Sequence, residues 1–193
     1  MNRKILAVAT IVFTAMMLFS FFAVASAGPA VRKTVEFTIR TAAVQNTAPE
    51  RTVTSDDGIT HQFGIIRTVP LESTVNMGTP PVPTVVKNVA LKINGVPIYG
   101  TVYAEVNVKI DPNTGVTSTH YLKWLLTFPV QPGVDVEGAF EGVHTYFIDT
   151  TPSISIVGHA VLQGSGGFEG QTLMLKVVFP PGPLVWKGDL LIK

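Results

Sequence analysis

Histidine is the side chain that most often carries acid–base or metal chemistry near neutral pH, and it occurs four times in this sequence. His61, His120, His144 and His159 form no H-x-H or H-E-x-x-H pattern, and there is no cysteine to supply a thiolate. No serine stands in a G-x-S-x-G elbow. The sequence therefore predicts no metal site and no bound cofactor, and it leaves open whether the protein is an enzyme.

His120 has the most suggestive neighbours of the four histidines. In strict alternation it shares a strand face with Val116, Leu122, Trp124 and Phe128, so it should point inward if that face is the core. Two readings follow: a core histidine with its hydrogen bonds satisfied, or a histidine that contacts a ligand in a cavity beside Trp124. In either case burial should lower its pKa and leave the imidazole neutral.

A second candidate surface is a stripe of polar and aromatic side chains, Tyr99, Tyr103, Glu105 and Asn107, on one face of a predicted strand. This stripe is either the polar wall of a ligand cavity or an exterior or subunit-contact face. The exterior reading is favoured because the opposite face is more uniformly apolar. The candidate ligand-binding residues are His120, Trp124, Tyr99, Tyr103 and Glu105.

Alternation of apolar and polar residues predicts strands along most of the chain. Asn94-Gly95, between two such segments, is a strong hairpin signal because both residues accept positive φ. The segments 43–58 and 70–83, polar and proline-rich respectively, are expected to be loops. The predicted strands are 34–41, 61–69, 85–93, 96–110, 116–128, 143–149, 153–163, 171–179 and 184–192. Eight or nine short strands without a helix predict an antiparallel sandwich or a closed barrel.

Residues 1–27 have the organisation of a secretory signal peptide. Arg3 and Lys4 precede an uncharged stretch, and Ala25-Ser26-Ala27 has the small-x-small form of a cleavage site. The stretch is also long enough to serve as an uncleaved membrane anchor. Either way, residues 28–193 are expected to form one exported domain, secreted or in the cell envelope, that meets a membrane only through this segment.

The content and balance of charged residues indicate which partners the protein can bind. Charged residues make up only 14% of the chain, well below the roughly 25% usual for soluble domains. Without Arg3 and Lys4, twelve basic residues face thirteen acidic ones, so the net charge is near −1. Binding to nucleic acid is therefore not expected.

A short motif occurs twice, as Gly138-Ala139-Phe140-Glu141-Gly142 and as Gly166-Gly167-Phe168-Glu169-Gly170. Glycines on both sides of a large aromatic residue let the backbone bend while the ring turns inward. We expect both copies to be structural corners with buried Phe140 and Phe168, in which Gly138, Gly142, Gly164, Gly166 and Gly170 supply the bends.

The stretch from Gln163 to Gly170, together with the strand that follows, resembles a hairpin of the allene oxide cyclase and dirigent families. The resemblance covers residues 161–177, with a looser similarity in Trp186-Lys187-Gly188. It implies an antiparallel eight-stranded β-barrel whose interior can hold a small apolar molecule and whose outer face supports dimers or trimers. No catalytic residue of these families can be placed on this sequence.

Three functions remain open. The first is a non-enzymatic exported barrel that binds a small apolar ligand or associates with a surface, and that can form homo-oligomers. The second is a dirigent-like or allene-oxide-cyclase-like enzyme that works in the barrel cavity. The third is a self-associating component of the cell envelope.

Overall fold

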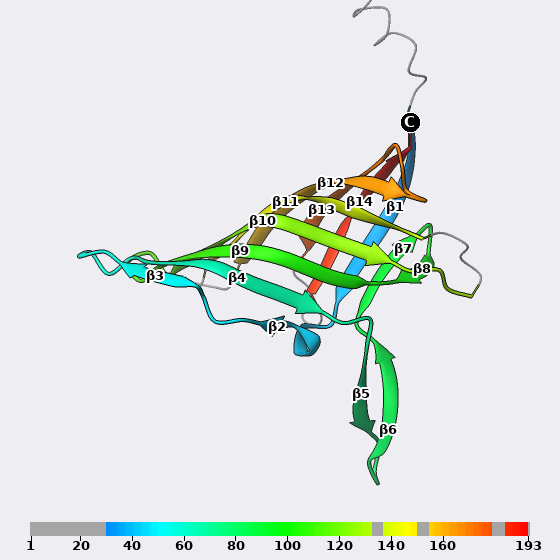
Figure 1. Cartoon of the computed structure of the whole chain (residues 1–193), viewed down its shortest axis with the longest axis horizontal. Coiled ribbons are helices and arrows are strands. Elements are labelled where there is room, and N and C mark those ends of the chain that lie inside the picture. Colours follow the sequence, from blue (N-terminus) through cyan, green and yellow to red (C-terminus); the bar gives the residue numbers. More distant parts are fainter. Residues whose placement is uncertain (1–29, 133–136, 150–154, 179–183, 193) are drawn as a thin grey trace, which may run out of the picture. The chain divides into compact units, whose positions relative to one another are not determined.

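β-Branched and aromatic residues recur along most of this chain, and they favour the extended backbone of a sheet. The computed structural model describes residues 30–132, 137–149, 155–178 and 184–192. Over these ranges it contains fourteen strands, one short 3-10 helix and no α-helix (Figure 1). The all-β prediction is therefore confirmed.

The strands follow one another with short connections. In chain order they are β1 (Val31–Ile39), β2 (Gln45–Asn46), β3 (Arg51–Thr54), β4 (Thr60–Val69), β5 (Glu72–Met77), β6 (Val82–Lys87), β7 (Val89–Ile93), β8 (Val96–Tyr99), β9 (Thr101–Asp111), β10 (Val116–Phe128), β11 (Gly138–Asp149), β12 (Ser155–Gly166), β13 (Gln171–Val178) and β14 (Leu184–Ile192). The 3-10 helix, η1, spans Thr41–Ala43 between β1 and β2.

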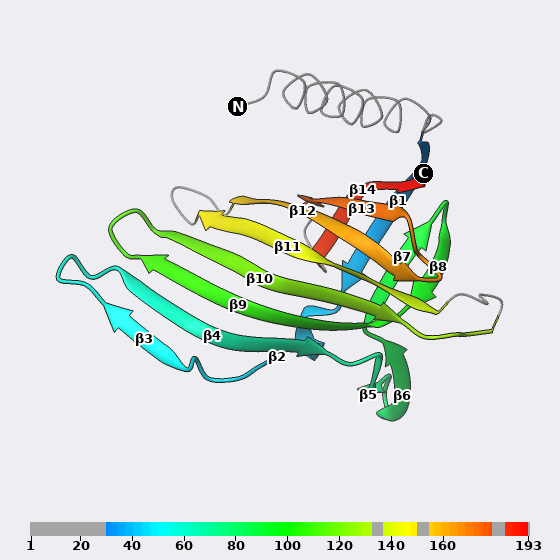
Figure 2. The same ribbon diagram turned by 45° about the horizontal axis from the view of Figure 1, so that its top comes forward.

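Twelve of the described strands form one large sheet with the order β2-β4-β9-β10-β11-β12-β13-β14-β1-β7-β8, and β3 pairs with β4 beside β2. Along this order, the strands pair antiparallel from β2 to β14 and from β1 to β8. The sheet is curled into a half-barrel, and its long strands β9, β10 and β11 curve together (Figure 2). The buried side chains gather on the concave face.

The strand count exceeds the eight or nine predicted because both expected loops contain strands, and because the expected strands 85–93 and 96–110 are each divided in two. Residues 45–54 supply β2 and β3, which pair with β4. Residues 72–87 form the separate two-stranded ribbon of β5 and β6. Proline was expected to prevent a ladder there. Each strand of a two-stranded ribbon has one open edge, so a missing N–H such as that of Pro83 can lie on the unpaired side.

Local turn signals predicted the hairpins well. Asn94 and Gly95 have φ of 51° and 85° and join β7 to β8, with Ile93 opposite Val96. The segment 96–110, expected as one strand, is divided at Gly100 into β8 and β9. The chain turns at Gly100 from pairing with β7 to pairing with β10.

The two copies of the repeated motif, 138–142 and 166–170, contact each other through their phenylalanine rings in the core. Phe140 and Phe168 are both buried, with ring centroids 4.6 Å apart, and Phe128 packs against each of them. The second copy forms the turn between β12 and β13, as expected, where Gly166 and Gly170 have positive φ. The first copy, however, lies within β11 rather than at a corner. Its Gly138 opposes Gly166 in the ladder, so the two copies are register neighbours.

The predicted leader, residues 1–27, lies outside the described residues. Within the described ranges, none of the helical segments has both the length and the apolar character needed to cross a bilayer.

Candidate functional site

Aromatic side chains fill much of the concave face. Trp124 is at the centre of this group, with ring centroids 5.7 Å from Phe37, 5.8 Å from Trp186 and 5.6 Å from Tyr121. The imidazole of His144 stacks on Trp124 at 4.8 Å. These residues come from β1, β10, β11 and β14, so the aromatic group links strands that lie far apart in the sheet.

An irregularity in β10 brings two of these rings together. The register with both neighbouring strands shifts by one residue between Tyr121 and Trp124, which is a β-bulge. The bulge changes which residues point inward: Tyr121 and Trp124 are both buried, while Leu122 is 58% exposed.

The prediction that His120 points inward is therefore wrong. Strict alternation from Trp124 places His120 on the inner face, but the extra residue of the bulge reverses that assignment. His120 is exposed, and its ring lies edge-on to Phe147 on the outside of the sheet. Trp124, on the far side of the bulge, is buried as predicted.

A cavity of about 250 Å³ remains beside the aromatic group. It is lined by four aromatic residues (Tyr121, Trp124, Tyr146 and Trp186), by Arg67, and by aliphatic side chains that include Ile39, Val69 and Val102. We call it the Arg67 cavity. A second hollow of about 340 Å³ adjoins it and shares Asn46, Arg67 and Tyr146 with its wall.

Arg67 is the unusual residue of this lining. It is half-buried on β4 between Ile65 and Val69, which are both buried and occupy the same face of the strand. Its Nε donates to Asn46 Oδ1 at 2.8 Å, and Nη1 donates to the hydroxyl of Tyr121. Its guanidinium carbon lies 5.5 Å from the centroid of the Tyr121 ring. The Asn46 amide and the Tyr121 hydroxyl thus fix the position of the Arg67 side chain, and neither of them carries a negative charge that would neutralise the guanidinium.

The positive charge of Arg67 is retained. Arginine does not lose its proton in proteins, and burial raises the pKa of Tyr121, so this phenol remains uncharged beside it. None of the ion pairs found among the described residues involves Arg67. The cavity wall therefore carries one positive charge without a carboxylate partner from the described part of the chain.

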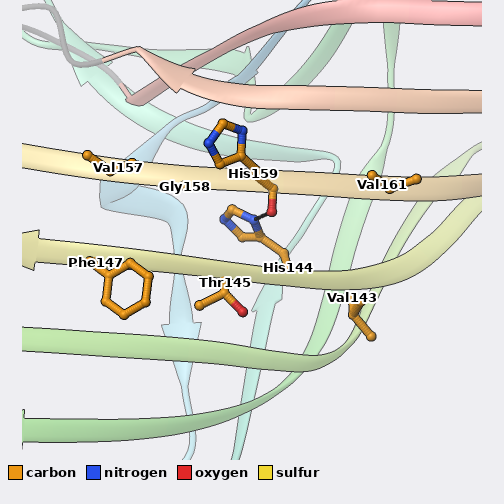
Figure 3. A pocket seen from close by; sticks show the side chains of 8 residues that line it. All are labelled: Val143, His144, Thr145, Phe147, Val157, Gly158, His159 and Val161. Atoms are coloured by element: carbon orange, nitrogen blue, oxygen red, sulfur yellow. Dashed lines mark hydrogen bonds between the residues drawn. The ribbon is translucent and has the colours of Figure 1, made fainter.

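His144 contributes a neutral ring to the same interior. Its Nδ1 lies 2.7 Å from the carbonyl oxygen of His159 (Figure 3). Because a carbonyl only accepts, Nδ1 carries the hydrogen and Nε2 is left as an acceptor without a described partner. Burial lowers the pKa of His144 to about 4, so the imidazole is uncharged at neutral pH.

The outer face of β11 and β12 has a shallow hollow of about 290 Å³ (Figure 3). Its apolar side chains, Val143, Phe147, Val157 and Val161, are between 46% and 65% exposed. His144, Thr145, Gly158 and the exposed His159 complete the lining, which contains no aspartate, glutamate, lysine or arginine. It is an apolar surface with little polar chemistry of its own.

The predicted polar stripe faces away from the Arg67 cavity. Its residues Tyr99, Tyr103 and Glu105 are half-buried. They lie on the other face of the strand from the buried Ile98, Val102 and Ala104. Tyr103 donates to Glu105 over 3.4 Å along this outer face. Of the five candidate ligand-binding residues, Trp124 is the one that lines the cavity.

Sequence reasoning missed Arg67, Tyr121 and Tyr146. Arg67 could have been found, because Ile65-x-Arg67-x-Val69 places a cation on the apolar side of an alternating strand. Tyr121 could not, because its inward direction depends on the bulge.

No group of three or more histidine, cysteine, aspartate or glutamate side chains that could hold a metal occurs in the described ranges. No protein-family model, curated protein or solved structure matches the chain. The relationship to the allene oxide cyclase and dirigent families, like the expected homo-oligomer, stays a prediction.

Proposed function

We propose that the protein is an exported β-barrel that binds a small apolar ligand in the Arg67 cavity. The observation that carries this proposal is the contrast within the concave face: it is packed with aromatic rings, yet beside them a cavity of about 250 Å³ is lined by four such rings and one guanidinium. A mostly apolar hollow with few, convergent polar groups is the usual form of a small-molecule site. The signal-like leader supports export.

The barrel part of the proposal rests on the chain path at Gly100. β8 pairs with β7, the chain continues through Gly100, and β9 pairs with β10. If β8 and β9 count as one bent strand, the order β9-β10-β11-β12-β13-β14-β1-β7 returns to its own start and contains eight strands. Gln131 supports this closure, since its side chain bonds both backbone groups of Tyr99, at 2.9 and 3.0 Å, just after the end of β10.

Intrinsic fluorescence provides a test. The chain has two tryptophans, Trp124 and Trp186, and both line the cavity. Titration with phenylpropanol, a neutral apolar probe, should change their emission saturably. Val44 also lines the cavity, so Val44→Phe should weaken binding by about tenfold or more, because a steric cost above about 1.4 kcal/mol suffices for that factor.

The matched control is Val161→Phe, which adds the same ring to the outer hollow of Figure 3. This variant should bind phenylpropanol like the wild type. Binding that survives in Val44→Phe and disappears in Val161→Phe would move the site to the outer face and reject the proposal.

A further inference from the structure

We propose that the ligand of the Arg67 cavity is a small apolar monocarboxylate whose carboxylate binds Arg67; this inference rests on the proposed function. It adds to that function the charge and chemical class of the ligand. The two statements can fail separately, since a neutral molecule could fill the same cavity.

The first support is the charge balance of the cavity. A guanidinium that is half-removed from water loses part of its hydration and is stabilised by a negative partner. Asn46, Tyr121 and Tyr146 supply uncharged acceptors to Arg67, and none of the ion pairs of the described residues reaches it. One cation without a negatively charged partner among the described residues matches one carboxylate.

The second support is the supply of hydrogen-bond donors. A guanidinium has five N–H donors in a planar fork that fits a carboxylate, and the contacts with Asn46, Tyr121 and Tyr146 use only part of that fork. The guanidinium donates and does not accept, so it selects a ligand group rich in acceptors.

The third support is the shape and polarity of the remaining wall. Tyr121 and Trp124 lie 5.6 Å apart, and Trp124 and Trp186 lie 5.8 Å apart between ring centroids. Flat apolar walls of this kind favour a ring or a compact hydrocarbon body. The volume of about 250 Å³ is below the roughly 300–1,000 Å³ of sites for drug-sized molecules. The cavity therefore fits an acid with a single ring better than an extended one.

The test compares probes that share one body and differ in their polar end: phenylpropionate, its methyl ester, phenylpropanol and phenylpropylamine. Each is titrated into the purified protein while tryptophan emission is recorded. The acid should bind about tenfold or more tightly than the ester and the alcohol, because its charged carboxylate accepts stronger hydrogen bonds from the guanidinium than a neutral oxygen does. The amine should bind more weakly than the alcohol.

Arg67→Met keeps the length of the side chain and removes its charge. It should abolish the preference for the acid, so that the acid and the alcohol bind to this variant within about twofold of each other. Arg51→Met is the matched control, because Arg51 also lies over an aromatic ring, 4.5 Å from the centroid of Phe63, but on the exposed strand β3. This control should keep the wild-type preference.

The outcomes separate the two proposals. Equal binding of acid, ester and alcohol by the wild type would overturn the carboxylate inference and leave the ligand-binding proposal intact. A preference for the acid that persists in folded Arg67→Met would also overturn it. Failure of every probe to bind the wild type would reject both. The probe comparison needs only the wild type, so it decides the matter even if Arg67→Met does not fold.

Discussion

Two basic side chains, Arg67 and His144, contact the buried aromatic rings, and burial affects the charge of each differently. Arg67 stays positive beside Tyr121 because a guanidinium does not release its proton. His144 instead gives up its charge, since burial against Trp124 lowers its pKa to about 4. The interior therefore has one fixed positive charge at the cavity and one neutral imidazole behind it.

The neutral state of His144 predicts a loss of stability in mild acid. In the unfolded chain a histidine has a pKa near 6.5, so between about pH 6.5 and pH 4 the unfolded state binds a proton that the folded state does not. The free energy of unfolding should therefore fall as the pH falls through this window. From pH 7 to about pH 5 the loss from this residue is about 2 kcal/mol.

Urea unfolding of the wild type and of His144→Gln at both pH values would measure this effect. The glutamine amide can still donate to the His159 carbonyl but does not titrate, so the pH dependence should shrink by about 2 kcal/mol. His159→Gln is the control, because the side chain of His159 is exposed. An equal pH dependence in wild type and His144→Gln would show that the buried ring is not the source.

At the scale of the element, the bulge in β10 explains which side chains could be predicted and which could not. Alternation correctly placed Trp124, Leu126 and Phe128 inside, because these residues follow the bulge in unbroken register. Alternation failed for His120, which precedes it. A single inserted residue leaves no mark in the pattern of apolar residues, since Leu122 is as apolar as a core residue yet 58% exposed.

Turn chemistry is local, and it could therefore be predicted from few residues. Asn94-Gly95 specified the β7–β8 hairpin because its positive φ values depend on those two residues alone. Pairing between distant segments depends on the whole sheet instead. The short strands β2 and β3 carry weak signals of their own, and they form because β4 offers them an edge.

The turn between β12 and β13 gives a prediction at this scale. Phe168 is 4% exposed and packs between Phe128 and Phe140. Phe168→Ala should lower the free energy of unfolding by about 3–5 kcal/mol, as truncation of a buried aromatic residue does. Glu169→Ala changes the exposed neighbour in the same turn and should stay within about 0.5 kcal/mol of the wild type. Denaturant unfolding of both variants measures these changes. Wild-type stability of Phe168→Ala would contradict the prediction and show that the ring does not anchor the turn.

At the scale of the whole sheet, Gly100 is the joint between two pairings. Its N–H donates to the carbonyl of Val89 in β7 at 3.2 Å. On its other side, a Cβ at this position would lie 2.3 Å from the carbonyl oxygen of Thr127 in β10. The same residue therefore contacts β7 and β10, which are far apart in the sheet order, and the space available there suits only a glycine.

Gly100→Ala tests whether close packing at Gly100 holds the sheet in the closed barrel that we propose. The added methyl group would overlap a backbone oxygen and the ring of Phe128, so β8 and β10 should be forced apart. We expect the free energy of unfolding to fall by about 1–3 kcal/mol, the usual cost of overpacking. Thr101→Ala, one residue later and opposite Thr127, is the control and should lose less than about 1 kcal/mol. If urea unfolding gives equal stability for Gly100→Ala and the wild type, the strands at this corner can separate freely, and the sheet would then be an open half-barrel rather than a closed ring.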